Sequence, residues 1–235
     1  MQSATRKKVL VTGGGSGIGA ATALHLAAGG WDVTICGRQQ ATLDDVAAQH
    51  ADRANPIRAV RLDVSDEPGV VALMRESQFD AAVCAAGIIL LQNVFDMSTA
   101  DFDRVMRVNL YGTYLVCREA MRNMRDNGRQ GDIVTLASLA GVRGMQVKFP
   151  GSFSYAASKH AVAGLTEALA TDGKPYGIRV NCVSTGPVDT AMSRQFGHIP
   201  SVKPPAVAAL IETLLDRARS GVVNGSNLEV YSNDD

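Results

Sequence analysis

The chain has 235 residues, of which 46% are hydrophobic and 20% charged, a composition typical of a soluble globular protein with one substantial core. Lysine plus arginine and aspartate plus glutamate number 23 each, so no net field favours binding to nucleic acid or to an anionic membrane. The longest apolar run, residues 81–91, is well short of the roughly 20 residues that span a bilayer, and the basic N-terminus lacks the apolar stretch of a signal peptide.

Short β-branched runs alternate with longer helical patterns along the whole chain. Strands are expected at residues 8–13, 32–37, 57–64, 79–87, 132–138, 178–186 and 227–232. Helices are expected at residues 17–30, 40–50, 67–77, 98–127, 153–173 and 204–220. This alternation predicts an α/β fold, a Rossmann-type doubly wound parallel sheet of about seven strands with helices on both faces. We expect residues 1–235 to form a single domain that binds ligands at the carboxyl ends of its strands.

A glycine-rich turn, TGGGSGIG at residues 12–19, joins the first strand to the first helix. Gly13, Gly17 and Gly19 let the backbone approach a phosphate, and the helix N-terminus offers free N–H groups and the positive end of a dipole. The spacing is G-x-x-x-G-x-G rather than the commoner G-x-G-x-x-G, and a tight turn without a ligand would also use these glycines. The strand–turn–helix context at the start of an alternating chain favours nucleotide binding.

The end of the second strand indicates which dinucleotide is bound. NAD-binding folds usually carry an acidic residue about 20 positions after the turn, to hold the ribose 2′-hydroxyl. Gly37 and Arg38 occupy that place here, and an arginine can bind a 2′-phosphate that a carboxylate would repel. We therefore predict that NADP(H) is favoured and NAD(H) possible, although Arg38 could also cap the sheet edge or stack on adenine. Asp63, with Val64 beside it, could accept from the adenine amino group or cap a turn.

Tyr155 and Lys159 stand one helical turn apart in SYAASKHAVAG, residues 154–164, among mostly small side chains. At this spacing the phenol and the ammonium share one face of the helix. A solvent-exposed pair on an ordinary helix has the same pattern. A fixed cation would also lower the pKa of the phenol from its usual value of about 10 toward working pH, which suits it to proton transfer.

Six short motifs follow one another in a particular order along the chain. They are TGGGSGIG at 12–19, CAAG at 84–87, VNLYG at 108–112, ASLAG at 137–141, YAASK at 155–159 and IRVNCVSTGPVDT at 178–190. With these motifs the chain resembles the short-chain dehydrogenase/reductase family, in its compact single-domain branch. The likeness covers residues 7–190 and continues more weakly to the C-terminus.

The resemblance implies a role for each matching residue. Tyr155 would exchange a proton with the substrate oxygen, Lys159 would hold the nicotinamide ribose, and Ser138 would orient the substrate carbonyl. Asn109 would support a water that links Lys159 to bulk solvent, and Thr190 would bond the nicotinamide carboxamide. The family pattern places the dinucleotide against Gly13, Gly15, Ser16, Gly17, Ile18, Gly19, Arg38, Asp63, Val64, Ala85, Ala86, Gly87, Tyr155, Lys159, Pro187, Val188 and Thr190.

Three of these residues also have simple structural interpretations. Ser138 could cap a turn, Asn109 could tie a helix to a strand, and Thr190 could cap a helix. The chain also departs from the family pattern at residues 84–87, which read Cys-Ala-Ala-Gly where Asn-Asn-Ala-Gly is customary. We expect the lost amide to weaken a contact that holds the central strand or the adenosine ribose.

Two loops are expected to set substrate specificity, residues 139–154, which look longer than is usual, and residues 187–204. With residues 88–91 they are largely apolar, which suits an aliphatic, alicyclic or aromatic ketone or secondary alcohol. The apolar candidates are Val142, Met145, Val147, Phe149, Phe153, Met192 and Phe196. A carboxylate or phosphate of an acyl carrier, as in a 3-oxoacyl thioester reductase, could instead be reached by Arg143, Lys148, Arg194 and His198.

The combined pattern predicts an NAD(P)(H)-dependent oxidoreductase that interconverts a ketone and a secondary alcohol. The main alternative is a catalytically silent NADP-binding regulator, although a sensor need not keep Ser138, Tyr155 and Lys159. A sugar-nucleotide epimerase or dehydratase would usually need a longer chain, and a methyltransferase would need the acidic residue that is missing after the second strand.

Two further expectations concern assembly and compartment. The helices at 98–126 and 152–172 carry more apolar surface than one sheet face covers, so a homotetramer or homodimer is expected. The four cysteines lie mostly in apolar runs, and neither they nor the four histidines have the spacing of a metal site. We expect reduced thiols, no metal and a cytoplasmic location.

Overall fold

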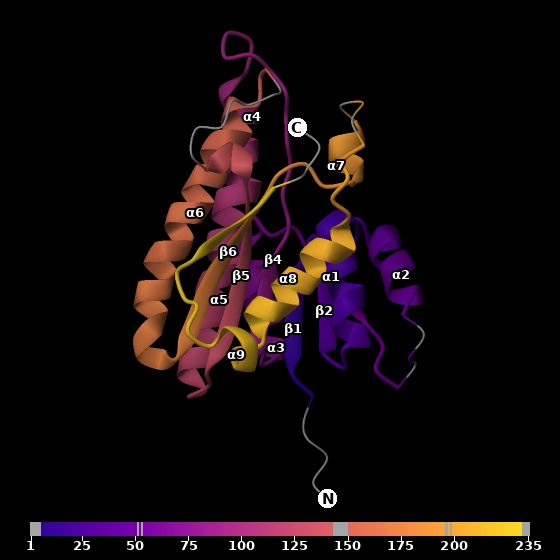
Figure 1. Ribbon diagram of the computed structural model, residues 1–235, viewed down its shortest axis with the longest axis vertical. Coiled ribbons are helices and arrows are strands. Elements are labelled where there is room, and N and C mark those ends of the chain that lie inside the picture. The colour runs from indigo at the N-terminus through magenta and orange to yellow at the C-terminus, as the bar shows by residue number, and fades with distance from the viewer. Residues whose placement is uncertain are drawn as a thin grey trace, which may run out of the picture.

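One parallel sheet organises the structure, a computed structural model that describes residues 6–50, 52, 54–142, 150–195, 197 and 199–231. Its strands follow the order β3-β2-β1-β4-β5-β6-β7 (Figure 1). They are β1 (Lys8–Thr12), β2 (Asp32–Gly37), β3 (Arg58–Arg61), β4 (Ala81–Cys84), β5 (Gly131–Ser138), β6 (Ile178–Thr185) and β7 (Asn227–Val230). The predicted Rossmann-type doubly wound sheet is confirmed, and the order reverses between β1 and β4, where such sheets bind ligands.

Helices cover both faces of this sheet. They are α1 (Gly17–Ala28), α2 (Gln40–Ala48), α3 (Glu67–Glu76), α4 (Thr99–Met106), α5 (Gly112–Asp126), α6 (Phe153–Gly173), α7 (Ala191–Arg194), α8 (Pro204–Leu215) and α9 (Arg217–Ser220). On one face α1, α2 and α8 enclose a core that contains Leu26, Leu43 and Ile211. On the other face α3 and α5 enclose a core that contains Leu73 and Leu115. In Figure 1 the carboxyl ends of the strands point upward, toward α4 and α7.

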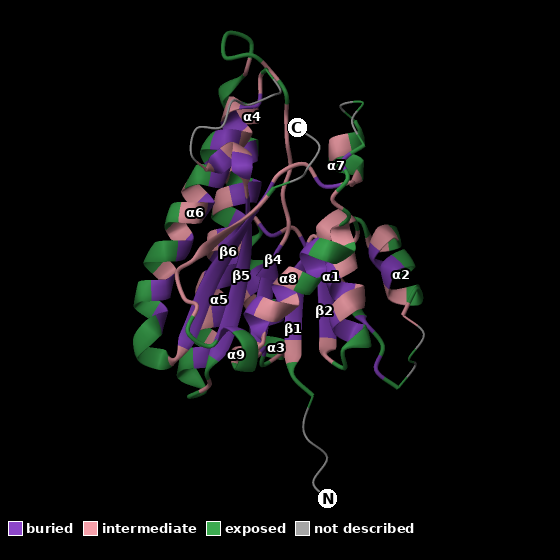
Figure 2. Ribbon diagram, in the orientation of Figure 1, coloured by how far each residue is buried: buried purple, intermediate pink, exposed green. Residues whose placement is uncertain are grey.

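The central strands are buried on both faces, which explains their nearly continuous apolar sequence. Every residue of β6 is buried, as is every residue of β5 except Ser138 at its carboxyl end. Successive side chains point to opposite faces, so Val9 packs in the α1 core and Leu10 in the α5 core. Figure 2 shows this burial concentrated in the strands and on the inward faces of the helices.

The long helix predicted over residues 98–127 is interrupted. A π-helical turn, η1 (Arg107–Tyr111), joins α4 to α5, and the Gly112 N–H donates to the Arg107 carbonyl five residues earlier. Such turns often occur at functional sites, and this one contains Asn109. The helix predicted over residues 204–220 is divided into α8 and α9 because Asp216 has an extended backbone and its carboxylate accepts the Ala218 N–H.

Strands β3 and β4 each end three residues earlier than predicted. After β3, the Asp63 carboxylate accepts the Ser65 N–H at 2.9 Å, which turns the chain. After β4, the Ala85 N–H donates back to the Val83 carbonyl at 3.2 Å. The chain therefore leaves the sheet at the edge where a ligand is expected.

The described part of the chain bears on the predictions about thiols, metals and membrane spans. All four cysteines are buried and carry free thiols, and the Cys84 and Cys117 sulfurs lie 3.7 Å apart. No group of three or more His, Cys, Asp or Glu residues that could hold a metal occurs among the described residues. None of the helices described is both long enough and apolar enough to cross a membrane.

A buried ion pair joins the amino ends of β5 and β6. Arg179 Nε lies 2.7 Å from Asp132 Oδ1, and the two side chains are 7% and 9% exposed. Arg179 also donates to the carbonyls of Leu214 and Ser220, which attaches α8 and α9 to the sheet. Arg217 of α9 adds a second contact to Asp132 at 2.9 Å. Burial makes this pair costly to break, because a single loss leaves a charge without its partner.

We expect Arg179→Ala to lower the free energy of unfolding by about 3 kcal/mol, because Asp132 loses its closest buried partner. Urea unfolding measures the change. Arg58→Ala, which removes a pair with Glu76 whose side chains are 46% and 58% exposed, should cost less than about 1 kcal/mol. Similar losses in the two variants would contradict the structural weight given to the buried pair.

Candidate active site

The glycine turn between β1 and α1 is packed tightly against its surroundings. Gly13 (φ 66°) has the left-handed backbone that favours glycine, and a Cβ there would lie 2.9 Å from the Ala85 backbone. A Cβ on Gly19 would lie 2.3 Å from the Gly13 carbonyl oxygen. Side chains are therefore excluded from both positions by backbone atoms, and the turn meets the end of β4 directly.

The N-terminus of α1 fits the diphosphate of a dinucleotide. Ser16 precedes the helix but makes no side-chain capping bond, and the first turn contains no acidic residue. The first backbone N–H groups and the positive end of the helix dipole can therefore act on an anion. Gly15 packs closely against α2, because a Cβ there would lie 2.5 Å from Thr42 Oγ1. These residues, with Gly17 and Ile18 in the first turn, are those that would hold NAD(P).

A second group of predicted residues lies at the carboxyl ends of β2 and β3. Arg38 follows Gly37 at the end of β2, is exposed, and makes no ion pair with the residues that the structure describes. Asp63 accepts both the N–H and the hydroxyl of Ser65, so its turn-capping role is realised. Val64 is buried against α5, since a Cβ on Gly112 would lie 2.5 Å from Val64 Cγ2.

Thr12 holds the turn that follows β4, a role that the sequence analysis missed. The Ala86 N–H donates to Thr12 Oγ1 at 3.1 Å, linking the ends of the adjacent strands β1 and β4. Cys84, where we expected a lost contact, packs instead against Cys117. The signal available in the sequence was the threonine that ends the first strand directly before the glycines. A polar side chain at that position can accept a backbone N–H from the chain that follows the neighbouring strand.

Asn109 holds the same turn from the other side. It is fully buried, its Oδ1 accepts the Ile88 N–H at 2.8 Å, and its Nδ2 donates to the Ile88 carbonyl at 2.9 Å. Nδ2 also donates to Ser158 Oγ at 3.0 Å, and the Ser158 hydroxyl donates to the Tyr155 carbonyl at 2.7 Å. The amide of Asn109 thus joins η1 to the segment after β4 and to α6, whereas the structural role considered for it was to tie a helix to a strand. Ser158 was not predicted.

Lys159 brings its ammonium into the interior beside these groups. Its Nζ donates to the Leu136 carbonyl at 2.7 Å and lies 5.6 Å from the centre of the Tyr155 ring. A Cβ on Gly87 would lie 3.6 Å from Nζ and 3.4 Å from Asn109 Oδ1, so Gly87 completes the enclosure. Burial lowers the pKa of Lys159 from 10.5 to about 8, against weaker opposing effects of nearby Cys182 and Cys84.

Tyr155 and Ser138 meet at the carboxyl end of β5. Burial raises the pKa of the Tyr155 phenol above its usual value of 10, and a hydrogen bond with Ser138 opposes that rise. The direction is opposite to our prediction that Lys159 would lower it. The ammonium faces the ring and is bonded to Leu136, so the desolvation of the phenol dominates. Ser138 Oγ also accepts the Ala140 N–H at 3.2 Å, the turn-capping role considered for it.

Thr190 lies between the glycine turn and the carboxyl end of β6. It caps α7 by accepting the Ser193 N–H, while Ser193 Oγ accepts the Thr190 N–H in return. A Cβ on Gly17 would lie 3.2 Å from Thr190 Cγ2, so the threonine methyl faces the start of α1. Val188 is buried in the α1 core, and Pro187 before it is partly buried. The helix-cap interpretation of Thr190 is therefore realised beside the predicted dinucleotide site.

The substrate loops are described in part. Phe153 stacks on Phe102 of α4, with ring centres 6.3 Å apart, and Met192 is 37% exposed. Arg194, considered as a possible anion contact, pairs with Asp189 at 2.6 Å. Val142 is partly buried, and the remaining candidates lie outside the described residues, namely Arg143, Met145, Val147, Lys148, Phe149, Phe196 and His198.

Comparisons with known proteins agree with this geometry. The profile of the short chain dehydrogenase family matches residues 7–199. The chain is 36% identical over 195 residues to the 3beta-hydroxysteroid dehydrogenase of Mediterraneibacter gnavus, covering 80% of this chain and 68% of that protein. It is 33% identical over 253 residues to the (3R)-3-hydroxyacyl-CoA dehydrogenase of Rattus norvegicus, covering 94% and 93%. The structure of ElxO with NADP bound has a TM-score of 0.86 at 27% identity, covering 97% of this chain and 98% of that one.

The fold and the site define an NAD(P)-binding oxidoreductase of the Rossmann type. The chain belongs to the short-chain dehydrogenase/reductase family, enzymes that act on CH–OH groups with NAD(P) as the acceptor. The resemblance predicted from the sequence motifs is thereby confirmed.

We expect Lys159→Met to be more stable than the native chain at pH 7 and to lose that advantage as the pH rises. The folded state binds the Lys159 proton less tightly than the unfolded chain, so the penalty is complete below about pH 8 and vanishes above about 10.5. The lowering of the Lys159 pKa corresponds to a change of roughly 3 kcal/mol, across this pH range, in the difference between the unfolding free energies of the variant and the native chain. Urea unfolding at pH 7, 8.5 and 10 measures it.

Lys174→Met is the matched control, because Lys174 is an exposed lysine on η3 (Lys174–Tyr176). Its difference from the native chain should not change with pH. A pH-independent difference for Lys159→Met as well would show that the folded state does not depress the pKa of Lys159.

Proposed function

We propose that the protein is an NADPH-preferring reductase that converts a ketone to a secondary alcohol, with Tyr155 as the general acid. One observation carries the proposal. Tyr155, hydrogen-bonded to Ser138, has a buried ammonium beside its ring, at the sheet edge that also carries the glycine turn. No other part of the described chain joins a proton donor to a dinucleotide cradle.

Bound NADPH would supply a hydride to the carbonyl carbon. Tyr155 gives its phenolic proton to the carbonyl oxygen as that oxygen gains charge, and the C=O bond becomes CH–OH. Burial raises the pKa of the phenol, so Tyr155 is protonated near neutral pH, as the proposed proton donor must be. Ser138 orients the substrate carbonyl through its hydroxyl. Lys159 stabilises the phenolate that remains, through a positive charge 5.6 Å from the ring centre.

Two features support NADPH over NADH. Arg38 is exposed and unpaired among the described residues at the end of β2, where the ribose of a bound dinucleotide would lie. The residue before it is Gly37, so no carboxylate stands at that position to repel a 2′-phosphate. The similar ElxO structure was solved with NADP bound.

The substrate proposed is an apolar ketone held by residues 139–154 and 187–204 of a single domain. The similarity to a hydroxysteroid dehydrogenase supports an alicyclic ketone. A 3-oxoacyl thioester is the second candidate, favoured by the hydroxyacyl-CoA dehydrogenase that matches 94% of this chain. The pairing of Arg194 with Asp189 speaks against it, because that cation is already neutralised.

We also propose a cytoplasmic homotetramer or homodimer. Tyr111, which ends η1 within the segment 98–126 expected to pair with a second copy, is 37% exposed, and Tyr176 of η3, shortly after α6, is 50% exposed. Partly exposed aromatic side chains are enriched at interfaces between subunits.

We expect Tyr155→Phe to lose roughly 10²- to 10⁴-fold in kcat, the usual contribution of a positioned general acid. Its NADPH dissociation constant should change little, since the phenol acts on the substrate oxygen. NADPH oxidation across a panel of alicyclic, aromatic and 3-oxoacyl ketones provides the assay. A native chain that binds NADPH and reduces none of them would favour a silent NADP-binding regulator.

We expect Arg38→Asp to reverse the cofactor preference, because the new carboxylate repels a 2′-phosphate and can accept from a ribose 2′-hydroxyl. The ratio of kcat/KM for NADPH to that for NADH should fall by about 100-fold, as for loss of an arginine–phosphate pair plus added repulsion. Arg75→Asp, the same charge change at an exposed position on α3, should leave the ratio unchanged. An unchanged ratio in Arg38→Asp would remove the basis for NADPH preference.

A further inference from the structure

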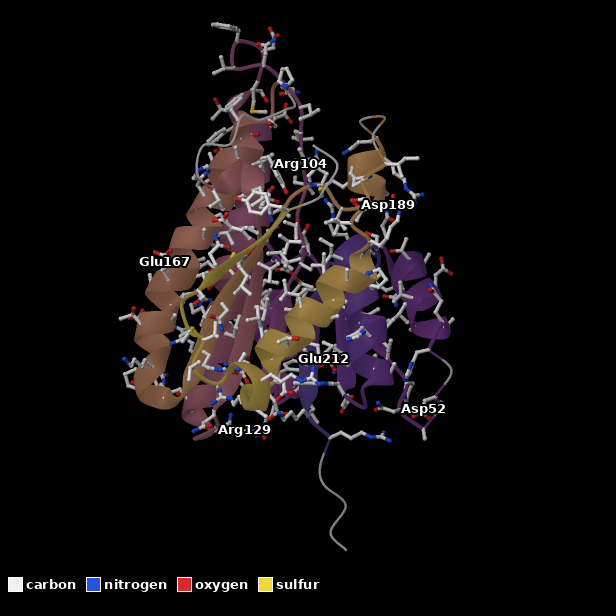
Figure 3. All side chains as sticks on the ribbon, in the orientation of Figure 1. Asp52, Arg104, Arg129, Glu167, Asp189 and Glu212 are labelled. Atoms are coloured by element: carbon white, nitrogen blue, oxygen red, sulfur yellow. The ribbon has the colours of Figure 1, made fainter. Side chains whose placement is uncertain are left out.

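Asp189 forms a compact ionic cluster next to the predicted dinucleotide site. Arg194 donates to both carboxylate oxygens of Asp189, at 2.6 and 3.0 Å, and Lys203 Nζ donates to Oδ2 at 2.8 Å. The Asp189 side chain is only 8% exposed, whereas Arg194 and Lys203 are 61% and 56% exposed. We call these three residues the Asp189 clamp. Figure 3 shows Asp189 beside α7, at the carboxyl end of the sheet.

The clamp joins segments that are separated along the chain. Arg194 is the last residue of α7, and Lys203 directly precedes α8. The backbone adds a third link, since the Asp189 N–H donates to the Val202 carbonyl at 2.8 Å. One carboxylate therefore fixes both the helix that follows it and the start of the next helix.

Asp189 of the clamp directly precedes Thr190, whose methyl faces Gly17 at the start of α1. Gly17 belongs to the turn that would hold the diphosphate, whereas Tyr155 and Lys159 lie on the opposite side, by β5 and β6. A dinucleotide that reached from the turn to Tyr155 would pass Thr190 with its nicotinamide half. Its adenosine half would lie on the other side of the turn, near Arg38 at the end of β2.

We infer that Asp189 is a positioning residue that holds Thr190 and α7 against the nicotinamide half of the dinucleotide. This inference rests on the proposed function for the identity of the ligand. Asp189 touches neither half itself and acts through the placement of Thr190. The pairs with Arg194 and Lys203 hold the pKa of the carboxyl well below its usual range, so the clamp stays charged at working pH.

Titration calorimetry of the full chain with two probes tests the inference. NADPH spans both halves of the site, and ADP occupies only the adenosine and diphosphate half. We expect Asp189→Asn to raise the NADPH dissociation constant about tenfold, as for loss of charge-assisted hydrogen bonds. The ADP dissociation constant should stay within about twofold of the native value.

Further variants separate positioning from general damage to the fold. Asp189→Glu keeps the charge and should restore part of the NADPH affinity, and the double variant Arg194→Gln, Lys203→Gln should match Asp189→Asn. Glu76→Gln removes an exposed ion pair at the far edge of the sheet and should change neither probe. Equal weakening of NADPH and ADP by Asp189→Asn, or no weakening of either, would overturn the inference. A native chain that binds both probes without reducing any ketone would refute the proposed reductase and leave this comparison intact.

Discussion

Lys159 carries an ammonium group into the interior at the carboxyl end of β5, and much of the site is arranged around that charge. Removing a cation from water is costly, and this burial lowers the pKa of Lys159 to about 8. The bond to the Leu136 carbonyl offsets part of the cost, and Gly87 lies beside the group, where an added Cβ would be 3.6 Å from Nζ. The turn after β5 also packs closely against Lys159, since a Cβ on Gly141 would lie 2.6 Å from the Lys159 backbone. A cation held at this cost has a narrow range of positions, which is the property that a catalytic site needs.

The parallel sheet explains how residues so distant in sequence reach that cation. Each strand ends at the same edge, so the segments after β1, β4, β5 and β6 meet there although they are far apart in the sequence. Polar side chains then join the segments in pairs, Thr12 to Ala86 and Asn109 to Ile88. The amino edge is held separately, by Asp132 with Arg179. The buried ion pair and the candidate active site thus lie at opposite ends of the strands. Loops at the carboxyl ends can therefore vary while the core stays constant.

Sequence reasoning succeeded where local periodicity or an ordered set of motifs carries the information. The alternating apolar runs predicted each strand of the observed sheet, and α6 begins and ends where the sequence predicted. Prediction failed where a single side-chain contact decides. Examples are the bond from Ala86 to Thr12, over a long separation, and the break at Asp216, where a contact two residues along the chain ends a pattern that periodicity would continue. The Asp189 clamp is of the same kind, because Lys203 lies on another segment and no spacing rule connects the two.

The pKa of Tyr155 shows why electrostatics could not be predicted from spacing. A lysine one turn away suggested a more acidic phenol, but its effect depends on how much water both groups keep. In the folded chain desolvation dominates, so the phenol holds its proton more tightly and the lysine holds its proton less tightly than in water. The two shifts have one cause, since each group avoids carrying charge in a poorly solvated site. In the reaction that we propose, proton transfer from Tyr155 would become favourable only when charge develops on a substrate oxygen beside it, and the phenolate left behind would give the ammonium a partner. Such a site would form an ion pair during the reaction rather than hold one before it.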